Sequence, residues 1–335
     1  MPIISYREAL TDALTIEMDR DERTIIIGED VAGGAGGSAN CRDNQNGIFG
    51  TYPQFFEKYG ENRFIDMPIS EAAIAAAAAG AALAGLRPVA EIMFADFIGY
   101  CLDQIMNQAA KFRYMFGGTS KTPMVLRTAW GAGLSAAAQH SQAIYPLITH
   151  IPGVKVVVPS KPADVKGLML TAMRDDDPVI FFDHKALFGV EGEVPDGDYE
   201  IPFGKASITR EGDDCTVVAI GRMVHFSESV IDKLGGEGIS CDMLDPRTTS
   251  PLDEDAILES VEKTGRLVVV EESPPRCCVA NDIAAIVASK GFDSLEAPIE
   301  LVTCAHSPVP FSPVLERAYI PSADNIEAAI RKTLE

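Results

Sequence analysis

The chain has 335 residues, of which 47% are hydrophobic and 23% are charged, and its formal net charge at pH 7 is −21. This length predicts two domains, and the ordinary composition argues against long disordered or low-complexity regions. The negative charge argues against nucleic acid as a partner, because binding to phosphates relies on a basic surface. The first ten residues lack the basic and apolar regions of a signal peptide, so we expect a cytoplasmic protein without a membrane partner.

The seven cysteines contain no C-x-x-C pair, and no histidine lies near them at metal-ligand spacing. This pattern argues against structural zinc. Several of the cysteines lie in apolar stretches such as "DCTVVAI", where a free thiol behaves as a small hydrophobic side chain in a reducing compartment.

Short runs of Val and Ile alternate with helical patterns in the first half of the chain. Predicted strands are "TIIIG" at 24–28, "RPVAEI" at 87–92, "PMVLR" at 123–127, "VKVVVPS" at 154–160 and "PVIFFD" at 178–183. Continuous apolar strands separated by helices are typical of a parallel sheet with both faces covered. The sequence therefore predicts an α/β fold.

The glycine-rich run "EDVAGGAGGSAN" at 29–40 follows the first predicted strand. It has neither the G-x-G-x-x-G spacing nor a Gly-Lys-Ser/Thr ending, and no helix pattern begins directly after it. We predict a mobile loop there, and a nicotinamide-dependent hydroxy-acid dehydrogenase is disfavoured.

The segment "MPISEAAIAAAAAGAALAGL" at 67–86 predicts a helix that is too alanine-rich for a membrane span. Ala and Gly on every side predict a helix packed all round, with Glu71 at its N-terminus and at the edge of a core. An acid in the first turn, directly after a Ser that can cap the helix, is also favoured by the helix dipole. Helix capping is therefore the alternative role of Glu71.

Two further stretches carry candidate site residues. His140 lies in "SAAAQHSQ", after the glycine-bearing "RTAWGAG", and is the histidine best placed for proton transfer near neutral pH. No G-x-S-x-G elbow accompanies it, so a hydrolase is the weaker alternative. Phe94 and Phe97 in "EIMFADF" follow a strand, where an aromatic ring is either core or a platform for a flat heterocycle.

The composition changes in "KALFGVEGEVPDGDYEIP", where Gly, Pro and acidic residues indicate a connection between domains. We predict a first domain at 1–185, a linker at 186–202 and a second α/β domain at 203–335. The second domain is predicted to contain strands at 215–221, 239–245 and 265–272 and a helix around 225–234.

The ordered motifs "MPISEAA", "GLRPVAEIMFADF", "DQIMNQAAKFRYMFGG", "AAAQHSQ", "PGVKVVVPS" and "RDDDPVIFF" resemble the β subunit of the thiamine-diphosphate-dependent dehydrogenases of multienzyme complexes. These are the pyruvate, branched-chain 2-oxo acid and acetoin dehydrogenases. The resemblance extends through "DPRTTSPLDEDAI" and "KTGRLVVVEE", essentially end to end. It implies a transketolase-like pyrimidine-binding domain followed by a transketolase C-terminal-like domain.

The resemblance also implies roles for individual residues. Glu71 matches the glutamate that hydrogen-bonds the pyrimidine ring of the cofactor and activates it, and a carboxyl group in an apolar pocket retains its proton more readily. Phe97 matches the ring that stacks on the pyrimidine, and His140 matches the histidine that steadies or protonates substrate-derived intermediates. The family's potassium site, built mostly of backbone carbonyls, falls on Met124, Ala172, Met173, Asp175 and Asp177.

Related enzymes hold the diphosphate and magnesium with a Gly-Asp-Gly motif and a downstream Asn, which this chain lacks. The resemblance therefore implies an obligate α partner that holds the magnesium, in an α2β2 assembly, and a dihydrolipoyl acyltransferase that docks on the second domain. "PPRCCVANDI", "RTAWGAGLSAAAQHSQ" and "FRYMFGG" resemble the acetoin-type chains, so acetoin is favoured over pyruvate or a branched-chain 2-oxo acid. A non-catalytic scaffold relative and a self-sufficient transketolase-like enzyme are the alternatives of other classes.

Overall fold

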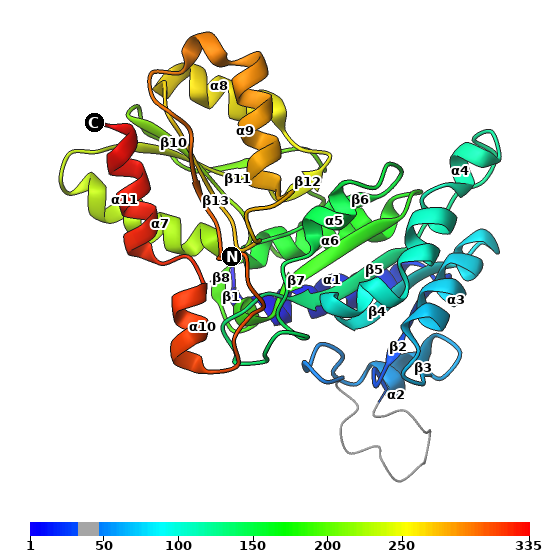
Figure 1. The fold of residues 1–335 in the computed structure, drawn as a ribbon. Helices are drawn as coiled ribbons and strands as arrows, with labels where there is room; N and C mark the ends of the chain where they lie inside the picture. The colour runs from blue at the N-terminus through cyan, green and yellow to red at the C-terminus, as the bar shows by residue number, and fades with distance from the viewer. Residues whose placement is uncertain (33–46) are drawn as a thin grey trace.

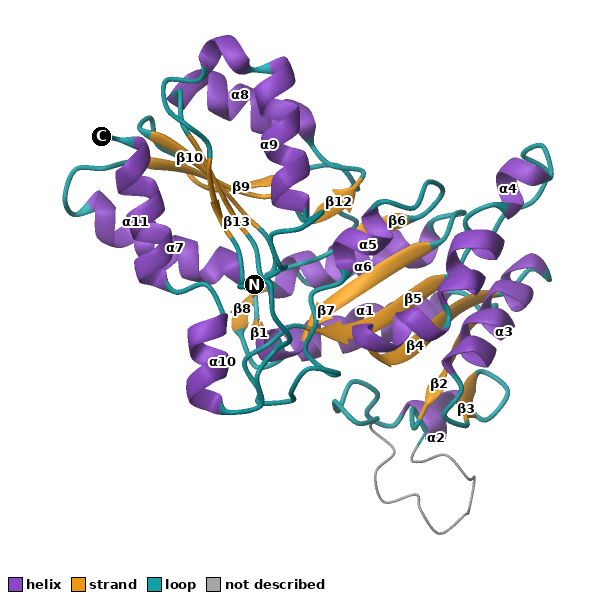
Figure 2. Cartoon of the chain, in the orientation of Figure 1, coloured by secondary structure: helices purple, strands orange, loops and turns teal. Residues whose placement is uncertain are grey.

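The computed structural model describes residues 1–32 and 47–335. Each half of the chain is built around one sheet flanked by helices (Figures 1 and 2). Most of the glycine-rich run at 29–40, with the loop predicted there, lies outside the described residues. Among the helices of the described parts, none combines the length and apolarity needed to cross a membrane.

The first sheet has seven strands, and six of them are parallel to one another. In spatial order they are β12 (Thr248–Ser250), β6 (Lys155–Val157), β7 (Val179–His184), β5 (Val125–Trp130), β4 (Arg87–Phe94), β2 (Thr24–Glu29) and β3 (Phe64–Met67). The predicted parallel sheet is confirmed. Its exception is β12, which comes from the second half of the chain and pairs antiparallel with β6.

Helices cover both faces of this sheet. On one face, α1 (Tyr6–Arg20) packs against α6 (Pro162–Arg174). On the other face lie α3 (Glu71–Leu83), the π-helical η3 (Gln104–Ala109) and α5 (Tyr145–Thr149). The remaining elements of this half are α2 (Phe55–Tyr59), η2 (Ala95–Tyr100), α4 (Phe112–Met115) and η4 (Lys185–Leu187).

The helix α3 is buried on one side only. Its core-facing residues are Ile74, Ala75, Ala78, Ala79 and Ala82, a spacing that follows the helical period. Its opposite side is exposed in the chain by itself, at Ala73, Ala76, Ala77 and Gly80. The prediction of a helix packed all round is wrong, because no other segment of the described chain covers this side.

The second sheet has five strands, of which only β9 is antiparallel to its neighbour. In spatial order they are β14 (Glu300–Val302), β13 (Leu267–Val270), β10 (Cys215–Ala219), β11 (Cys241–Asp245) and β9 (Ser207–Arg210). The helices of this half are α7 (Met223–Gly235), α8 (Glu254–Thr264), α9 (Val279–Lys290), η5 (Phe292–Ser294), α10 (Pro313–Tyr319) and α11 (Ala323–Thr333).

The two halves share one hydrophobic core. The buried cluster that contains Ile74 of α3 and Phe182 of β7 continues to Val218 of β10 and Ile283 of α9. A short ribbon adds to the junction, because β1 (Ile3–Ser5) pairs antiparallel with β8 (Glu191–Glu193), which lies inside the predicted linker at 186–202. The connecting segment is therefore hydrogen-bonded to the start of the chain.

Candidate active site

The candidate site lies at the carboxyl edge of the first sheet. The neighbouring parallel strands β2, β4, β5 and β7 end there at Glu29, Phe94, Trp130 and His184. In open α/β sheets, ligands bind beyond the carboxyl ends of the strands. The three catalytic and cofactor residues predicted from the sequence all lie close to these ends.

Glu71 is the first residue of α3, and its relative exposure is only 9%. Ser70 occupies the N-cap position, but its side chain makes no capping hydrogen bond. Within the described parts of the chain, no hydrogen bond or ion pair to the Glu71 carboxylate is present. Glu71 is thus largely buried while its carboxylate has no partner in the described chain, so this site is suited to a ligand that completes its hydrogen bonding.

Glu71 lies close to two other titratable groups. Burial, followed by the negative charges of Asp30, Glu71 and Glu91, raises the pKa of Glu29 at the end of β2. Burial and the charge of Glu71 raise the pKa of the Cys101 thiol, directly after η2, to about 12. Sequence reasoning missed Glu29, although its place at the end of the first predicted strand was a signal.

The structure brings Phe97 and His140 together. Phe94 ends β4 and Phe97 lies in η2, and their ring centroids are 5.9 Å apart with the planes at 85°. The His140 ring lies edge-on to both, with centroid distances of 4.5 Å to Phe94 and 5.3 Å to Phe97. The helix α3 contacts η2, so the Glu71 end of α3 and this aromatic cluster belong to one region.

Lys185 fixes the backbone of the segment that carries His140. It follows β7 directly, is buried, and its Nζ donates to the carbonyl oxygens of both Gly131 and His140. Burial lowers the pKa of Lys185 to about 8, although the charges of Asp96, Glu272 and Glu316 act in the opposite direction. Sequence reasoning placed Lys185 only at a domain boundary, because its carbonyl partners lie far away in the sequence.

A buried ionic network lies beneath the strand ends. Arg127 of β5 pairs with Glu91 of β4 and with Asp183 of β7, and it also donates to the hydroxyl of Tyr52. The Tyr6 hydroxyl donates to Asp183 at 3.0 Å. Burial and the charge of Asp183 raise the pKa of Tyr6, and burial with the charge of Glu91 raises that of Tyr52. The network ties together the three central strands on which the site is built.

The residues predicted for potassium gather at the C-terminal end of α6 and at the start of β5. Arg87 donates to the carbonyl oxygens of Met173 and Asp175 at 2.9 and 2.6 Å, and Val179 donates to that of Met124 at 3.0 Å. Lys155 pairs with the Asp175 side chain, and Arg113 with that of Asp177. Ala172 lies in the last turn of α6. Several of these carbonyls therefore already accept protein hydrogen bonds, and potassium stays a prediction.

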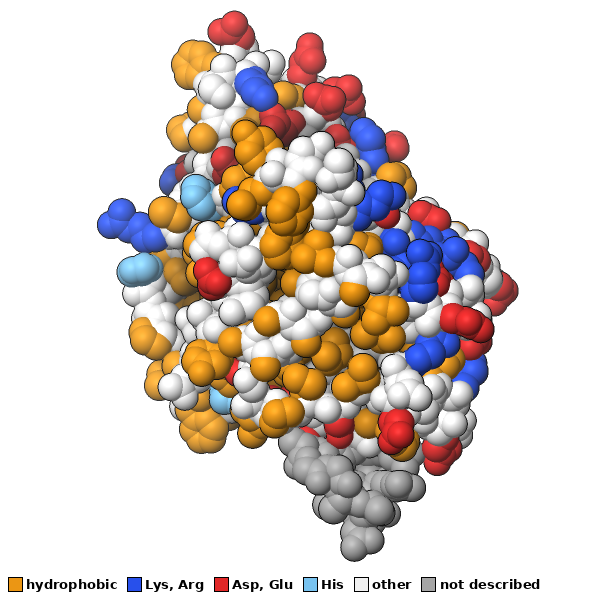
Figure 3. All heavy atoms as spheres, turned by 90° about the vertical axis from the view of Figure 1, so that its right-hand side faces the viewer, with side chains coloured by type: hydrophobic (Ala, Val, Ile, Leu, Met, Phe, Trp, Pro, Cys, Tyr) orange, Lys and Arg blue, Asp and Glu red, His pale blue; other side chains and the backbone are white. Residues whose placement is uncertain are grey.

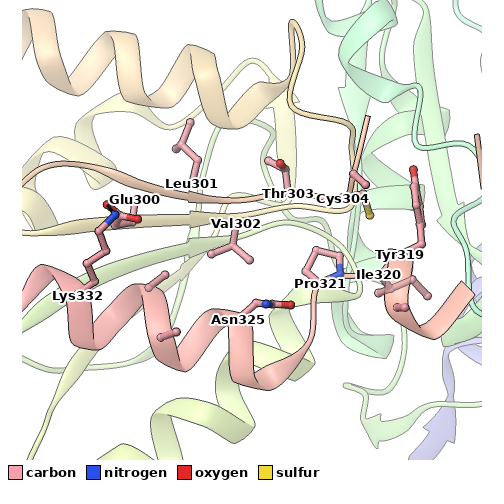
Figure 4. A pocket seen from close by; sticks show the side chains of 14 residues that line it. Glu300, Leu301, Val302, Thr303, Cys304, Tyr319, Ile320, Pro321, Asn325 and Lys332 are labelled. Atoms are coloured by element: carbon pink, nitrogen blue, oxygen red, sulfur yellow. Dashed lines mark ion pairs between the residues drawn. The ribbon is translucent and has the colours of Figure 1, made fainter. Parts of the chain in front are cut away.

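Carboxylate, imidazole and thiolate groups do not gather for a metal anywhere in residues 1–32 and 47–335, where no cluster of three or more is present. Of the cysteines in these ranges, all six are free, and only Cys277 is exposed. A pocket of about 500 Å³ in the second half lies between β14, α10 and α11 (Figure 4). It contains the ion pair of Glu300 with Lys332, at 2.8 Å, and none of the predicted site residues.

Comparisons with known proteins agree with this architecture. Residues 3–190 match the family described as "Transketolase, pyrimidine binding domain", and residues 204–326 match "Transketolase, C-terminal domain". A solved structure titled "Split gene transketolase, inactive beta4 tetramer" superposes with a TM-score of 0.78 at 24% identity, covering 99% of this chain and 98% of that chain. That likeness supports the fold.

The curated relatives extend over almost the whole chain. Acetoin:2,6-dichlorophenolindophenol oxidoreductase subunit beta of Cupriavidus necator is 54% identical over 332 residues, covering 99% of this chain and 98% of the relative. The protein of the same name from Bacillus subtilis is 52% identical, covering 97% and 95%. Pyruvate dehydrogenase E1 component subunit beta of Rickettsia felis is 43% identical, covering 98% of each.

Proposed function

The chain belongs to the family of β subunits of acetoin and 2-oxo acid dehydrogenases, and from that premise we propose that it cleaves acetoin on thiamine diphosphate together with an α subunit. The disulfide of a lipoyl group on a lipoyl domain then oxidises the retained two-carbon fragment to an acyl group and accepts it as a thioester, leaving the second sulfur as a thiol. The observation that carries the proposal is the buried, unpartnered carboxylate of Glu71 beside the Phe94, Phe97 and His140 cluster. The 54% and 52% identities to two chains named acetoin:2,6-dichlorophenolindophenol oxidoreductase subunit beta favour acetoin over pyruvate and branched-chain 2-oxo acids.

The residues present fit the pyrimidine end of thiamine diphosphate. Within the described chain, the Glu71 carboxyl group is free of protein hydrogen-bonding partners and can form a hydrogen bond with a ring nitrogen of the pyrimidine. Phe97, in η2 directly after β4, offers a ring for contact with a flat heterocycle. Thiamine diphosphate, when bound, supplies the nucleophilic carbon and takes up the electron pair released when a bond to the substrate carbonyl breaks.

His140 handles the substrate side of the reaction in this proposal. An imidazole nitrogen either donates a proton to a developing alkoxide or accepts one from a hydroxyl. Phe94 and Phe97 contact its ring edge-on, and Lys185 fixes its backbone carbonyl. These contacts keep the ring next to Phe94, at the end of β4.

We propose that the α subunit holds the diphosphate and magnesium and covers the exposed side of α3, in an α2β2 assembly. This side presents Ala73, Ala76, Ala77 and Gly80 directly beyond Glu71, and small residues allow close approach of a second backbone. Figure 3 looks onto the side of the molecule on which α3 and α4 lie, and hydrophobic side chains gather there in a broad area. Exposed apolar areas of this kind mark protein interfaces.

Two finer parts of the proposal concern other partners. The acyltransferase of the complex docks on the second half of the chain, whose acidic character suits a basic partner surface. Potassium binds at the carbonyls of Met124, Ala172, Met173, Asp175 and Asp177.

The test is steady-state turnover of the purified chain, alone and mixed with its α subunit, on acetoin, pyruvate and a branched-chain 2-oxo acid with a dye acceptor. We expect turnover only in the mixture, with acetoin preferred. If the mixture prefers a 2-oxo acid, that acid replaces acetoin as the proposed substrate, and the proposed enzyme class is unchanged. Absence of turnover of all three substrates by the mixture would overturn the proposal and favour a non-catalytic scaffold. The presence of Glu71, Phe97 and His140 in one region argues against such a scaffold.

Glu71→Ala separates catalysis from helix capping. We expect kcat to fall by roughly 100-fold or more, the range of general acid–base contributions, with no change in the assembly of the complex. Asp255→Ala is the matched control, because Asp255 is an exposed acid in the first turn of α8. Full activity of Glu71→Ala, with a loss of stability similar to that of the control, would assign Glu71 to capping alone.

A further inference from the structure

The segment between β5 and His140 has an irregular backbone. Gly131 and Gly133 have φ angles of 92° and 109°, and Ser135 and Ala137 have φ angles of 53° and 63°. Side chains other than glycine rarely adopt positive φ, and such conformations persist only where surrounding groups enforce them. The shape of residues 131–140 is therefore held by contacts from outside the segment.

Those contacts come largely from the second half of the chain. Glu316 on α10 is 3% exposed, and its carboxylate accepts from the Gly133 amide at 2.7 Å and from the Ser135 amide at 2.9 Å. The Ser135 hydroxyl donates to the same carboxylate at 3.3 Å. Glu272, which follows β13, accepts from the Ala132 amide. Two buried carboxylates thus accept from the amides of Ala132, Gly133 and Ser135 in one strained segment.

The first half holds the same segment from the other side. The Nζ of Lys185 donates to the carbonyl oxygens of Gly131 and His140. One side-chain amino group therefore binds both ends of the segment. Hydrogen bonds to ionised groups are shorter and stronger than neutral ones. Within residues 1–32 and 47–335, no hydrogen bond joins Glu316 or Lys185 to the His140 ring, yet Lys185 binds the His140 carbonyl and Glu316 binds the amides of Gly133 and Ser135 in the segment that leads to it.

We propose that Glu316 is a positioning residue for His140 that acts across the boundary between the two halves of the chain. The inference rests on the proposed catalytic role of His140. Small displacements of a catalytic group reduce the rate strongly, because the reacting atoms must meet in a narrow range of geometries. The second half of the chain, through one carboxylate, thereby sets the geometry of a site in the first half.

The test uses Glu316→Gln in the reconstituted complex with the α subunit. Gln has nearly the same shape as Glu, but an NH2 group replaces one of the two carboxylate oxygens. This group is a donor and faces the amide N–H of either Gly133 or Ser135, so one of the two hydrogen bonds is lost. We expect kcat to fall about tenfold with little change in KM, as expected for lost orientation. Glu300→Gln is the matched control, because it makes the same change in the same half of the chain, at an ion pair with Lys332 (Figure 4), and in the described residues Glu300 makes no hydrogen bond to residues 131–140.

A double-mutant cycle identifies the route of the effect. If Glu316 acts through His140, Glu316→Gln lowers kcat less than twofold when His140→Ala is already present. A tenfold fall in both backgrounds, or no fall in the unsubstituted background, overturns the proposal. A variant His140→Ala with unchanged kcat overturns the proposed role of His140 and, with it, the positioning role of Glu316.

Amide hydrogen exchange supplies a readout that does not depend on turnover. We expect faster exchange of a peptide covering residues 131–140 in Glu316→Gln and no change in Glu300→Gln. Unchanged exchange in Glu316→Gln overturns the proposal even where kcat falls. If the unsubstituted complex is inactive while Glu316→Gln still shows the faster exchange, the proposed function is overturned. Glu316 is then a structural residue only.

Discussion

Arg127→Met should destabilise the protein strongly, because it removes the cation of a buried network. Arg127 is 1% exposed and pairs with both Glu91 and Asp183, which are 4% and 0% exposed. Burial disfavours its charged form, but the negative charges of Glu91 and Asp183 outweigh this and raise the pKa of Arg127. Removing one partner of a buried ion pair costs about 3–5 kcal/mol, since a charge remains without compensation.

The expected shift in Tm follows from the size of the chain. The core runs through both halves, so we treat unfolding as one transition. The unfolding entropy is about 0.7 kcal/mol/K for a chain of 335 residues, and a loss of 3–5 kcal/mol therefore lowers Tm by about 4–7 °C. Differential scanning calorimetry of the purified chain measures this shift.

Two further variants test the explanation. Arg210→Met removes a partner of the exposed Asp232 and should lower Tm by about 1 °C or less, because exposed ion pairs contribute little. Adding Glu91→Gln and Asp183→Asn to Arg127→Met removes the uncompensated charges and should restore at least half of the lost Tm. A shift below 2 °C for Arg127→Met, or no recovery in the triple variant, would refute the reasoning.

Three further predictions concern pH and ions. Burial and the charge of Asp164 raise the pKa of Asp245 to about 7, so the folded state binds a proton more tightly than the unfolded chain and stability falls as pH rises from about 4 to about 7. Asp245→Asn should therefore lose less of its urea midpoint between pH 5 and pH 8 than the unsubstituted protein; equal losses would contradict the assignment. For Lys185 the lowered pKa of about 8 has the opposite sign, because the unfolded state binds more protons between about pH 8 and pH 10. Stability should thus rise with pH in that window, and Lys185→Met should abolish the rise. If potassium binds as proposed, replacing sodium chloride by potassium chloride at equal ionic strength raises Tm, whereas equal Tm values would remove potassium from the proposal.

Much of the first sheet could be predicted from the sequence because its strands are buried on both faces. The runs at 24–28 and 178–183 correspond closely to β2 and β7, which consist almost entirely of buried residues. The strand predicted at 123–127 begins two residues before β5 and ends three residues before the end of β5, because β5 extends from Val125 to Trp130. Continuous apolar runs identify a strand well, but they do not identify its ends.

Features that depend on distant partners were not predictable in the same way. Nothing in "DPRTTSP" distinguishes β12 from a loop, because its pairing strand β6 lies far upstream. Glu316 and Lys185 are ordinary charged residues in the sequence, and their importance comes from amides and carbonyls of residues 131–140. The exposed side of α3 was mispredicted because alanine is compatible with both burial and exposure.

The position of β12 has a consequence for synthesis of the chain on the ribosome. The N-terminus of a nascent chain leaves the ribosome first, so β6 is synthesised long before Thr248–Ser250. Until then, one side of β6 presents unpaired amide and carbonyl groups, which invite pairing with other chains. We expect the first sheet to reach its final form only after most of the protein has been translated, and truncated products that end before residue 248 to be prone to aggregation.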